Sequence, residues 1–284
     1  APNAEPAPAP LVAGATDREI TVNTTTVQAV FTSRGATLRH WRLKQYSDSK
    51  GDPLDLIPAD LPAAEAQPLS LRLDDAAASS RLSQAVYLAS STTDVVDVTT
   101  SPATLAFTYE DAAGLRARKE FRFDPTGYVL TATMSVTVAG RDLSPTVVWG
   151  PGLGDAVPSA SSGGFFNRNA VVPPEVILHR SGSVERIALN KVADQRTQEG
   201  QFRYAGVDDH YFLVAFLNTG QARAEFRPLV VPAANGAQRQ LISQAIRLLQ
   251  PSAAVRVFAG PKQFDLLQSI DGELVRAVNF GMFA

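Results

Sequence analysis

Histidine and acidic side chains are the first candidates for chemistry in this chain, because it contains no cysteine that could act as a nucleophile, a thiolate ligand or half of a disulfide. Of His40, His179 and His210, only His210 has acidic neighbours, in the stretch DDHYF after Asp208 and Asp209. Successive strand residues point to opposite faces, and no H-x-H or H-x₃-H spacing is present to gather metal ligands. The sequence therefore favours a structural or surface role for His210 over metal binding or acid–base catalysis.

Other patterns that could form an active site have simpler explanations. The acidic pairs Asp74–Asp75 and Glu110–Asp111 each close a predicted strand, where turn chemistry accounts for them. The glycine-rich stretch 150–155 does not lead from a strand into a helix, as a phosphate-binding loop does. The serines of SASSGG lack a nucleophile-elbow pattern. We therefore expect no enzyme activity, no catalytic residue, no metal and no cofactor.

Composition excludes several further classes of function. With 26 Lys and Arg against 28 Asp and Glu, the net charge of −2 offers no field for nucleic acid, and aromatic residues do not alternate with basic ones. The apolar fraction of 45% is enough for a sizeable core. The longest apolar run, 211–217, is far shorter than the roughly 20 residues of a spanning helix. Lack of cysteine fits an oxidising compartment.

A period of two in the hydrophobic pattern predicts antiparallel strands with one solvated face. In 118–123, Phe121 and Phe123 point inward, and a DPTG turn connects this strand to 128–138. The run 211–217 is apolar on both faces and should be a central strand, and 240–250 is interpreted as a strand rather than a helix. The inward residues of the clearest strand are Tyr128, Leu130, Ala132, Met134, Val136 and Val138.

The chain divides into three predicted parts: a Pro/Ala-rich linker at 1–18, a β domain at 19–259 and a C-terminal helix at 260–284. The linker begins APNAEPAPAP and has no periodic apolar pattern. The helix is expected to start with Gly260 as cap and Pro261 in its first turn. Long loops with short strands are expected between 151 and 200. The apolar stripe of the helix consists of Leu267, Ile270, Leu274 and Val278.

Four stretches together resemble the large periplasmic domain of the YidC-type membrane protein insertases of Gram-negative bacteria. The first is VFTSRGATLRHWRLKQYSDSKGDPLDLI, and the second is RKEFRFDPTGYVLTATMSV. The third is DDHYFLVAFLN, and the most specific is VFAGPKQFDLLQSIDGELVRAVNFGMF, with its Gly-Pro-Lys start and Asn-Phe-Gly-x-Phe finish. They occur in the family's order over 20–284. Ala36 departs from the pattern, since a second glycine is usual there, and 204–206 lacks a frequent tryptophan.

The resemblance implies an antiparallel β-supersandwich, similar in shape to galactose mutarotase, that is closed by an amphipathic C-terminal helix. It also implies a transmembrane helix before residue 1, and an interfacial helix and five more spans after residue 284. The helix would then connect to the membrane surface, with Phe280, Met282 and Phe283 as its membrane-proximal residues.

The function that the resemblance implies is that of a non-catalytic domain on the periplasmic face of the inner membrane. It would belong to an insertase that assists membrane protein insertion and folding, alone or with the Sec translocon. Its partners would be Sec components and nascent membrane proteins, and the isolated domain would be monomeric.

A carbohydrate-binding or mutarotase-like periplasmic protein is the alternative. It requires an acid and a base in the cleft, or a sugar stacked on Trp41 or Trp149. An unrelated envelope sandwich remains a third interpretation, and it predicts no downstream spans.

Overall fold

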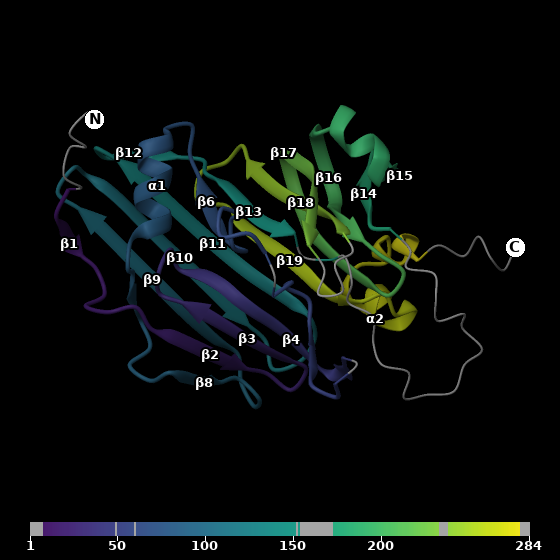
Figure 1. The fold of residues 1–284 in the computed structure, drawn as a ribbon, viewed down its shortest axis with the longest axis horizontal. Helices are drawn as coiled ribbons and strands as arrows, with labels where there is room; N and C mark the ends of the chain where they lie inside the picture. The colour runs from purple at the N-terminus through teal and green to yellow at the C-terminus, as the bar shows by residue number, and fades with distance from the viewer. Residues whose placement is uncertain are drawn as a thin grey trace, which may run out of the picture.

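The computed structural model describes residues 8–48, 50–59, 61–151, 153, 173–232 and 238–278, which form two β-sheets, two short α-helices and two 3₁₀ helices (Figure 1). Every pairing between the described strands is antiparallel except that of β2 with β8. The smaller sheet has the order β5 (Pro53–Asp55), β4 (Thr37–Ser47), β3 (Val27–Thr32), β2 (Glu19–Asn23) and β8 (Val95–Asp97).

The larger sheet contains 14 of the described strands. Its main path is β1 (Pro10–Val12), β9 (Ala103–Asp111), β10 (Leu115–Phe123), β11 (Val129–Val138), β19 (Ala254–Pro261), β17 (Phe212–Pro232), β16 (Thr197–Asp208), β14 (Glu175–Arg180) and β15 (Ser183–Ala188). Beside this path, β12 (Arg141–Leu143) pairs with β11, β7 (Leu88–Ala89) with β9, β18 (Gln238–Leu248) with β17, β13 (Thr146–Pro151) with β18 and β6 (Ser70–Arg72) with β13.

The predicted hairpin is present as β10 and β11, with Gly127 of the DPTG turn at a φ of 89° that suits glycine. Phe121 and Phe123 are buried, as the alternation predicts. The stretch 240–250 is mostly strand β18, which confirms the choice of strand over helix. In β11 and just before it, Tyr128, Leu130, Ala132, Met134 and Val136 are buried, and Val138 is half-buried.

Strand β17 is the central strand of the larger sheet. Its apolar start pairs with β16 and β19 and is buried on both faces, as predicted. Its second half pairs with β16 and β18, so the sheet divides along this strand. Gly206 of β16 allows this packing, because a Cβ there would lie 2.2 Å from the carbonyl oxygen of Val214.

Aromatic side chains join the two sheets. Phe31 of β3 and Phe121 of β10 lie with their ring centroids 4.8 Å apart, and Trp41 of β4 donates from Nε1 to the carbonyl oxygen of Ala259 in β19 at 2.8 Å. Trp41 also contacts Trp149 edge to face, at 6.3 Å between ring centroids. These contacts make one continuous core and confirm the mainly β, supersandwich class with a short C-terminal helix.

Both ends of the chain differ in detail from the prediction. Residues 10–12 of the predicted linker form β1 on the edge of β9, with Pro10 opposite Asp111. At the other end Gly260 and Pro261 belong to β19, so the prediction that they start the helix was wrong. Lys262 N–H donates to the carbonyl oxygen of Tyr211, which keeps this segment extended.

The C-terminal helix is short and interrupted. It comprises α2 (Phe264–Ile270) and, after a turn, the 3₁₀ helix η2 (Leu274–Ala277). Asp271 breaks the helix, because its φ of −163° is extended and its carboxylate accepts the N–H of Glu273. The apolar stripe is retained: Leu267 and Leu274 are buried, and Ile270 and Val278 pack against the core.

Helix α1 (Ala76–Gln84) and the 3₁₀ helix η1 (Leu189–Asp194) complete the described elements. Asp75, expected in a turn, is the N-cap of α1 and accepts the N–H groups of Ala77 and Ala78. None of the helices in the described ranges is long and apolar enough to cross a membrane.

Candidate binding groove

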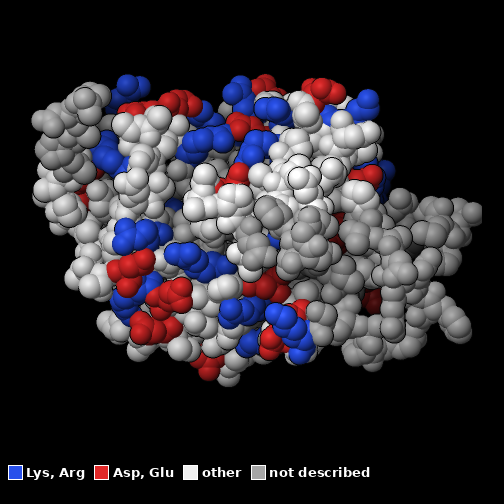
Figure 2. Space-filling model, viewed as in Figure 1, with Lys and Arg blue, Asp and Glu red and all other residues white. Residues whose placement is uncertain are grey.

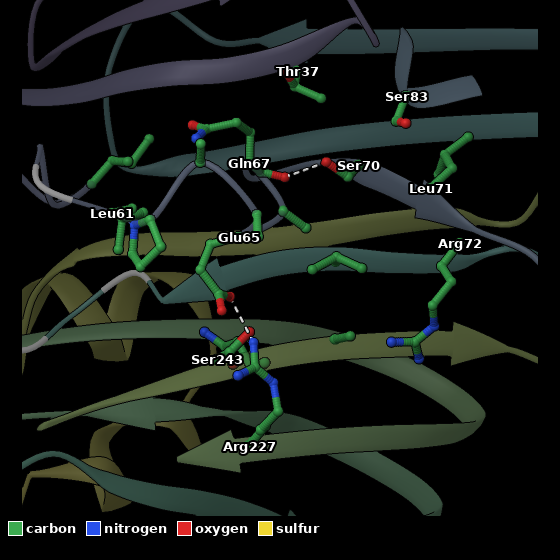
Figure 3. Close-up of a pocket in the computed structure, with 18 of the residues that line it drawn as sticks. Thr37, Leu61, Glu65, Gln67, Ser70, Leu71, Arg72, Ser83, Arg227 and Ser243 are labelled. Carbon is green, nitrogen blue, oxygen red and sulfur yellow. Dashed lines mark hydrogen bonds and ion pairs between the residues drawn. The ribbon is translucent and has the colours of Figure 1, made fainter. Parts of the chain in front are cut away.

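A groove of about 1180 Å³ lies beside the junction of the two sheets (Figure 3). It is lined by residues of β2 to β4, of the Pro/Ala-rich loop after β5, of β6, β13 and α1, and of β16, β17 and β18. Small-molecule sites usually measure about 300–1,000 Å³, so the groove has room for a larger, extended occupant. Hydroxyl side chains line it from several elements: Thr32, Thr37, Ser70, Ser79, Ser80, Ser83, Thr197 and Ser243.

The groove carries more positive than negative side chains, although the chain as a whole has a net charge of −2. Glu65 accepts from Arg227 Nη2 at 2.6 Å, and Figure 3 shows this ion pair between the loop and β17. Arg72 of β6 pairs with Glu225 of β17 in the same way. Its charged lining residues are Arg34, Arg39, Arg72, Arg196 and Arg227 with Glu19, Glu65 and Glu225.

Lys119 lies beneath the groove floor and was not singled out from the sequence. Its side chain is 1% exposed, and Nζ donates to the carbonyl oxygens of Gly35 at 2.6 Å, Ala36 at 3.1 Å and Leu69 at 2.8 Å. We call Lys119 with these three carbonyls the Lys119 clamp. Burial lowers the pKa of Lys119 to about 7. The alternation of β10 places Lys119 inside, between Ala117 and Phe121, and this is the signal that could have revealed it.

A second buried polar cluster fixes the C-terminal segment. Asp208 accepts from Arg186 Nη1 at 3.0 Å to each carboxylate oxygen and from Lys262 Nζ at 3.0 Å. Arg186 Nη2 also donates to the carbonyl oxygen of Ala277 at 2.7 Å. These four residues, together with the Arg203–Asp271 pair at 2.9 Å, are called the C-terminal anchor.

The DDHYF candidates do not converge on a metal. Asp208 belongs to the C-terminal anchor, while Asp209 Oδ1 accepts the N–H groups of Tyr211 and Phe212 at 2.7 Å each. Burial raises the pKa of Asp209. His210 is exposed, with its ring edge-on to Tyr211. In the part of the chain that the structure describes, no three His, Cys, Asp or Glu side chains are placed to hold a metal.

The other two histidines each contact a carboxylate. His40 Nδ1 lies 2.6 Å from Asp55 Oδ2 at the rim of the groove, and His179 Nε2 lies 3.1 Å from Glu273 Oε2. His179 is buried against Tyr204 and thereby adds a contact between β14 and the C-terminal segment.

The acidic pairs have structural contacts, and among them Asp111 makes the turn contacts that the sequence predicts. Asp111 is fully buried, pairs with Arg81 at 2.9 Å and accepts N–H groups of its own turn. Glu110 pairs with Arg116 across the hairpin. Asp74 pairs with Arg247, which lowers its pKa.

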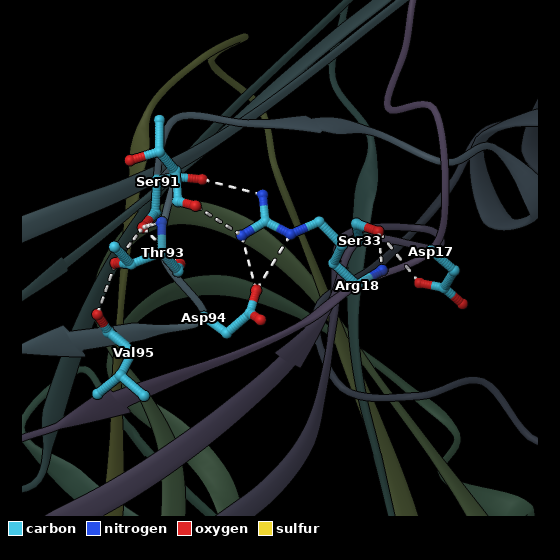
Figure 4. A network of polar contacts seen from close by, with 8 residues as sticks. Asp17, Arg18, Ser33, Ser91, Thr93, Asp94 and Val95 are labelled. Atoms are coloured by element: carbon cyan, nitrogen blue, oxygen red, sulfur yellow. Dashed lines mark hydrogen bonds and ion pairs between the residues drawn. The ribbon is translucent and has the colours of Figure 1, made fainter.

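A polar network at the edge of the smaller sheet joins β2 to the chain before β8 (Figure 4). Arg18 donates to Asp94 Oδ1 at 2.7 Å and to the carbonyl oxygen of Ser91 at 3.1 Å. Asp17 accepts from Thr32 and Ser33; burial raises the pKa of Asp17, but these hydrogen bonds and Arg34 lower it overall. Elsewhere on the face in Figure 2, acidic and basic side chains are interspersed.

Trp41 and Trp149 are both buried, so neither presents a ring on which a sugar could stack. The one aromatic side chain among the described residues that line the groove is Phe226, which is 2% exposed. Phe280, Met282 and Phe283, the expected membrane-proximal residues, lie outside the described residues.

Residues 19–284 match the family model described as the YidC periplasmic domain. A membrane protein insertase YidC from Geobacter metallireducens is 27% identical over 305 residues, which cover 99% of this chain and 52% of the relative. The insertase of the same name from Pelobacter propionicus is 26% identical, over 96% of this chain and 49% of the relative. The chain thus spans about half the length of these relatives.

Among solved structures, an aldose 1-epimerase homologue from Escherichia coli has 9% identity and a TM-score of 0.42, covering 87% of this chain and 99% of the other. An α-galactosidase from Lactobacillus brevis has 10% identity and a TM-score of 0.42, covering 91% of this chain and 41% of the other.

Proposed function

The chain belongs to the YidC periplasmic-domain family, and from this premise we propose that it is the non-catalytic periplasmic domain of an inner-membrane protein insertase. The insertase would assist the insertion and folding of membrane proteins, alone or with the Sec translocon. The observation that carries this proposal is the family match over 19–284, together with relatives that are about twice as long as this chain.

The groove supports a role in docking extended polypeptide. Its hydroxyl groups and arginines, which come from several elements, offer hydrogen-bond donors that an extended segment with free carbonyl groups can use. Its volume exceeds that of ordinary small-molecule sites. The domain would therefore hold a client segment on the periplasmic face before or after the membrane part acts on it.

Two of the three carboxylates that line the groove support a non-catalytic role. Glu65 and Glu225 each contact an arginine, whose guanidinium neutralises the carboxylate and does not give up its proton. An epimerase needs an acid and a base that face one substrate. The mutarotase-like alternative predicts that the chain accelerates galactose mutarotation. We expect polarimetry, at protein concentrations up to the micromolar range, to find no acceleration.

The C-terminal segment supports a position near the bilayer. Asp271 and Ala277 are fixed to the sheet by the C-terminal anchor, so the described chain up to Val278 is held against the domain. We include Phe280, Met282 and Phe283 in the proposal as residues that approach the membrane surface, where aromatic side chains are favoured.

Site-specific photo-crosslinking in the full-length insertase tests the proposal. A photoreactive residue is placed at Ser80 or Ser243, both in the groove, and at the exposed Ser101 outside it as the control. During synthesis of a membrane protein, crosslinks to the nascent chain are expected from the two groove positions and not from Ser101.

Depletion of the full-length protein is the companion measurement. Client insertion should fall on depletion and recover with the wild-type gene. If insertion is unaffected, the insertase function is wrong. If insertion depends on the protein but Ser80 and Ser243 give no more crosslinks than Ser101, the groove is not the docking site.

A further inference from the structure

Lys119 joins two segments of chain that both contribute to the groove lining. Gly35 and Ala36 lie between Arg34 and Thr37, which line the groove. Leu69 directly precedes Ser70 and Leu71, which also line it. A hydrogen bond from the Leu38 N–H to the carbonyl oxygen of Pro68, at 2.9 Å, joins the same two segments, and the ammonium group of Lys119 adds three contacts beside it.

The three carbonyls belong to residues with an unusual backbone. Gly35, Ala36 and Leu69 have φ values of 68°, 46° and 70°, in the left-handed region. For alanine and leucine this conformation is strained, and such residues persist where the surroundings hold them. The contacts with Lys119 are part of what holds them, since a left-handed residue turns its carbonyl away from the regular strand ladder.

The number of N–H donors makes the contact dependent on protonation. An ammonium group has three N–H donors, one for each carbonyl, whereas a neutral amine has two and a lone pair. Loss of one proton thus leaves one of the three buried carbonyls without this partner and places a lone pair among oxygen atoms. An unsatisfied buried polar group is unfavourable, so the backbone at that carbonyl has to move.

The charged and titratable groups around the clamp do not replace the missing proton. The ring of Tyr87, from the chain between α1 and β7, lies 5.6 Å from Lys119 Nζ, and burial raises the pKa of its phenol. No ion pair joins Lys119 to a carboxylate within the described residues. The nearby charged pairs are all occupied with one another: Arg34 with Asp17, Arg81 with Asp111 beside Tyr109, and His40 with Asp55.

We propose that Lys119 is a positioning residue for the groove: its protonated form holds the 34–37 and 68–71 segments at three carbonyls, and its neutral form frees one of these carbonyls and lets the backbone beside the groove move. The lowered pKa of Lys119 places this change near neutral pH. The inference rests on the proposed function only in taking the groove as the binding site. The clamp itself is a property of the chain and is tested without a client.

Nuclear magnetic resonance of the 284-residue chain, with ¹³C in the lysine ε-methylene groups and ¹⁵N in the amides, tests the proposal between pH 5.5 and 9.5. The Lys119 methylene is expected to titrate with a midpoint near 7, about three pH units below an ordinary lysine. The amide signals of Gly35, Ala36, Thr37 and Ser70 should shift with the same midpoint.

Three variants identify the origin of the transition. Lys119→Met should abolish the shift of the groove amides, whereas Lys44→Met should retain it, because Lys44 is exposed and donates to one carbonyl, that of Thr24. His40→Gln should also retain it, which separates Lys119 from the histidine at the rim.

A Lys119 midpoint near 10, or groove amides that do not follow the Lys119 titration, would overturn the proposal. If Lys119→Met does not fold, the wild-type and His40→Gln titrations alone decide the outcome, since the proposal requires coincident midpoints in both.

Discussion

Two buried ammonium groups occupy opposite kinds of site in this molecule. Lys262 contacts Asp208, a carboxylate that also holds Arg186, and both cations fix the C-terminal segment to the sheet. Lys119 contacts three neutral carbonyls under the groove and has no carboxylate partner among the described residues. A counter-ion makes a buried cation a permanent structural link, whereas carbonyl groups alone leave it conditional on its proton.

The same contrast extends to the ion pairs around each site. The cations of the groove pairs are partly open to solvent, with Arg227 47% and Arg72 49% exposed, whereas Arg186 and Lys262, which share Asp208, are 25% and 11% exposed. Solvent weakens exposed pairs, and burial makes the loss of one partner costly. The C-terminal end is therefore expected to be the rigid part of the domain and the groove the adaptable part.

The largest effect is expected for Asp208→Asn, which leaves Lys262 without its carboxylate partner and leaves Arg186 with Glu175, at 3.4 Å. The free energy of unfolding should fall by about 4 kcal/mol, as for other broken buried pairs. Urea unfolding followed by circular dichroism measures it. Asp74→Asn is the control, since Asp74 is 83% exposed in its pair with Arg247 and should change stability little. Equal changes for the two variants would contradict the comparison.

Leu274→Ala tests the apolar part of the same end. Leu274 is fully buried in η2, so its truncation should lower the free energy of unfolding by about 3 kcal/mol. Leu249→Ala is the matched control, because Leu249 is 64% exposed and should cost little. If proteolysis of the C-terminal segment is no faster in Leu274→Ala than in Leu249→Ala, the segment is not held by this contact.

Lys119 should produce a pH dependence of stability with a defined sign. Its folded pKa of about 7 is below the unfolded value of about 10.4, so between these values the unfolded chain binds more protons. The contribution of Lys119 to the free energy of unfolding therefore rises with pH, by about 2.3 kcal/mol from pH 7 to 9 with a slope that approaches roughly 1.4 kcal/mol per unit, and it is lost as pH falls through 7.

Urea titrations at pH 7, 8 and 9 measure this slope in the wild type and in Lys119→Met. The slope should be smaller in Lys119→Met by the amounts above, and Lys44→Met should behave like the wild type. Parallel curves for wild type and Lys119→Met would mean that Lys119 keeps its proton throughout this pH range.

The smallest effect is expected from the pair at the groove rim. A double-mutant cycle of Arg227→Ala and Glu65→Ala should give a coupling of about 0.5 kcal/mol that decreases with salt. The cycle of Arg203→Ala and Asp271→Ala should give a larger coupling. Asp271 is 9% exposed, and Arg203 Nε donates to both of its carboxylate oxygens. If the order is reversed, the groove rim is the more rigid of the two regions.

The strands could be predicted from the sequence because their pattern is local. Three patterns each involve only residues that are close together in the sequence: the alternation in β11, the apolar start of β17 and the turn at Gly127. The secondary structure near the two chain ends was harder to predict, because it depends on which distant strand each segment pairs with. Pro10 lies on β9, and Gly260 and Pro261 remain in a strand beside the start of β17, although the same residues also suit a linker and a helix start.

The sequence by itself determined the strand pattern, the buried faces and the family to which this chain belongs. Tertiary structure alone decided the groove, the Lys119 clamp and the C-terminal anchor. The physical reason is distance along the chain: Lys119 meets carbonyls 50 to 84 residues away, and Arg186 meets Ala277 91 residues away. Neither the period of the hydrophobic pattern nor a sequence motif predicts such contacts. They form only when the two sheets pack and bring separate segments together.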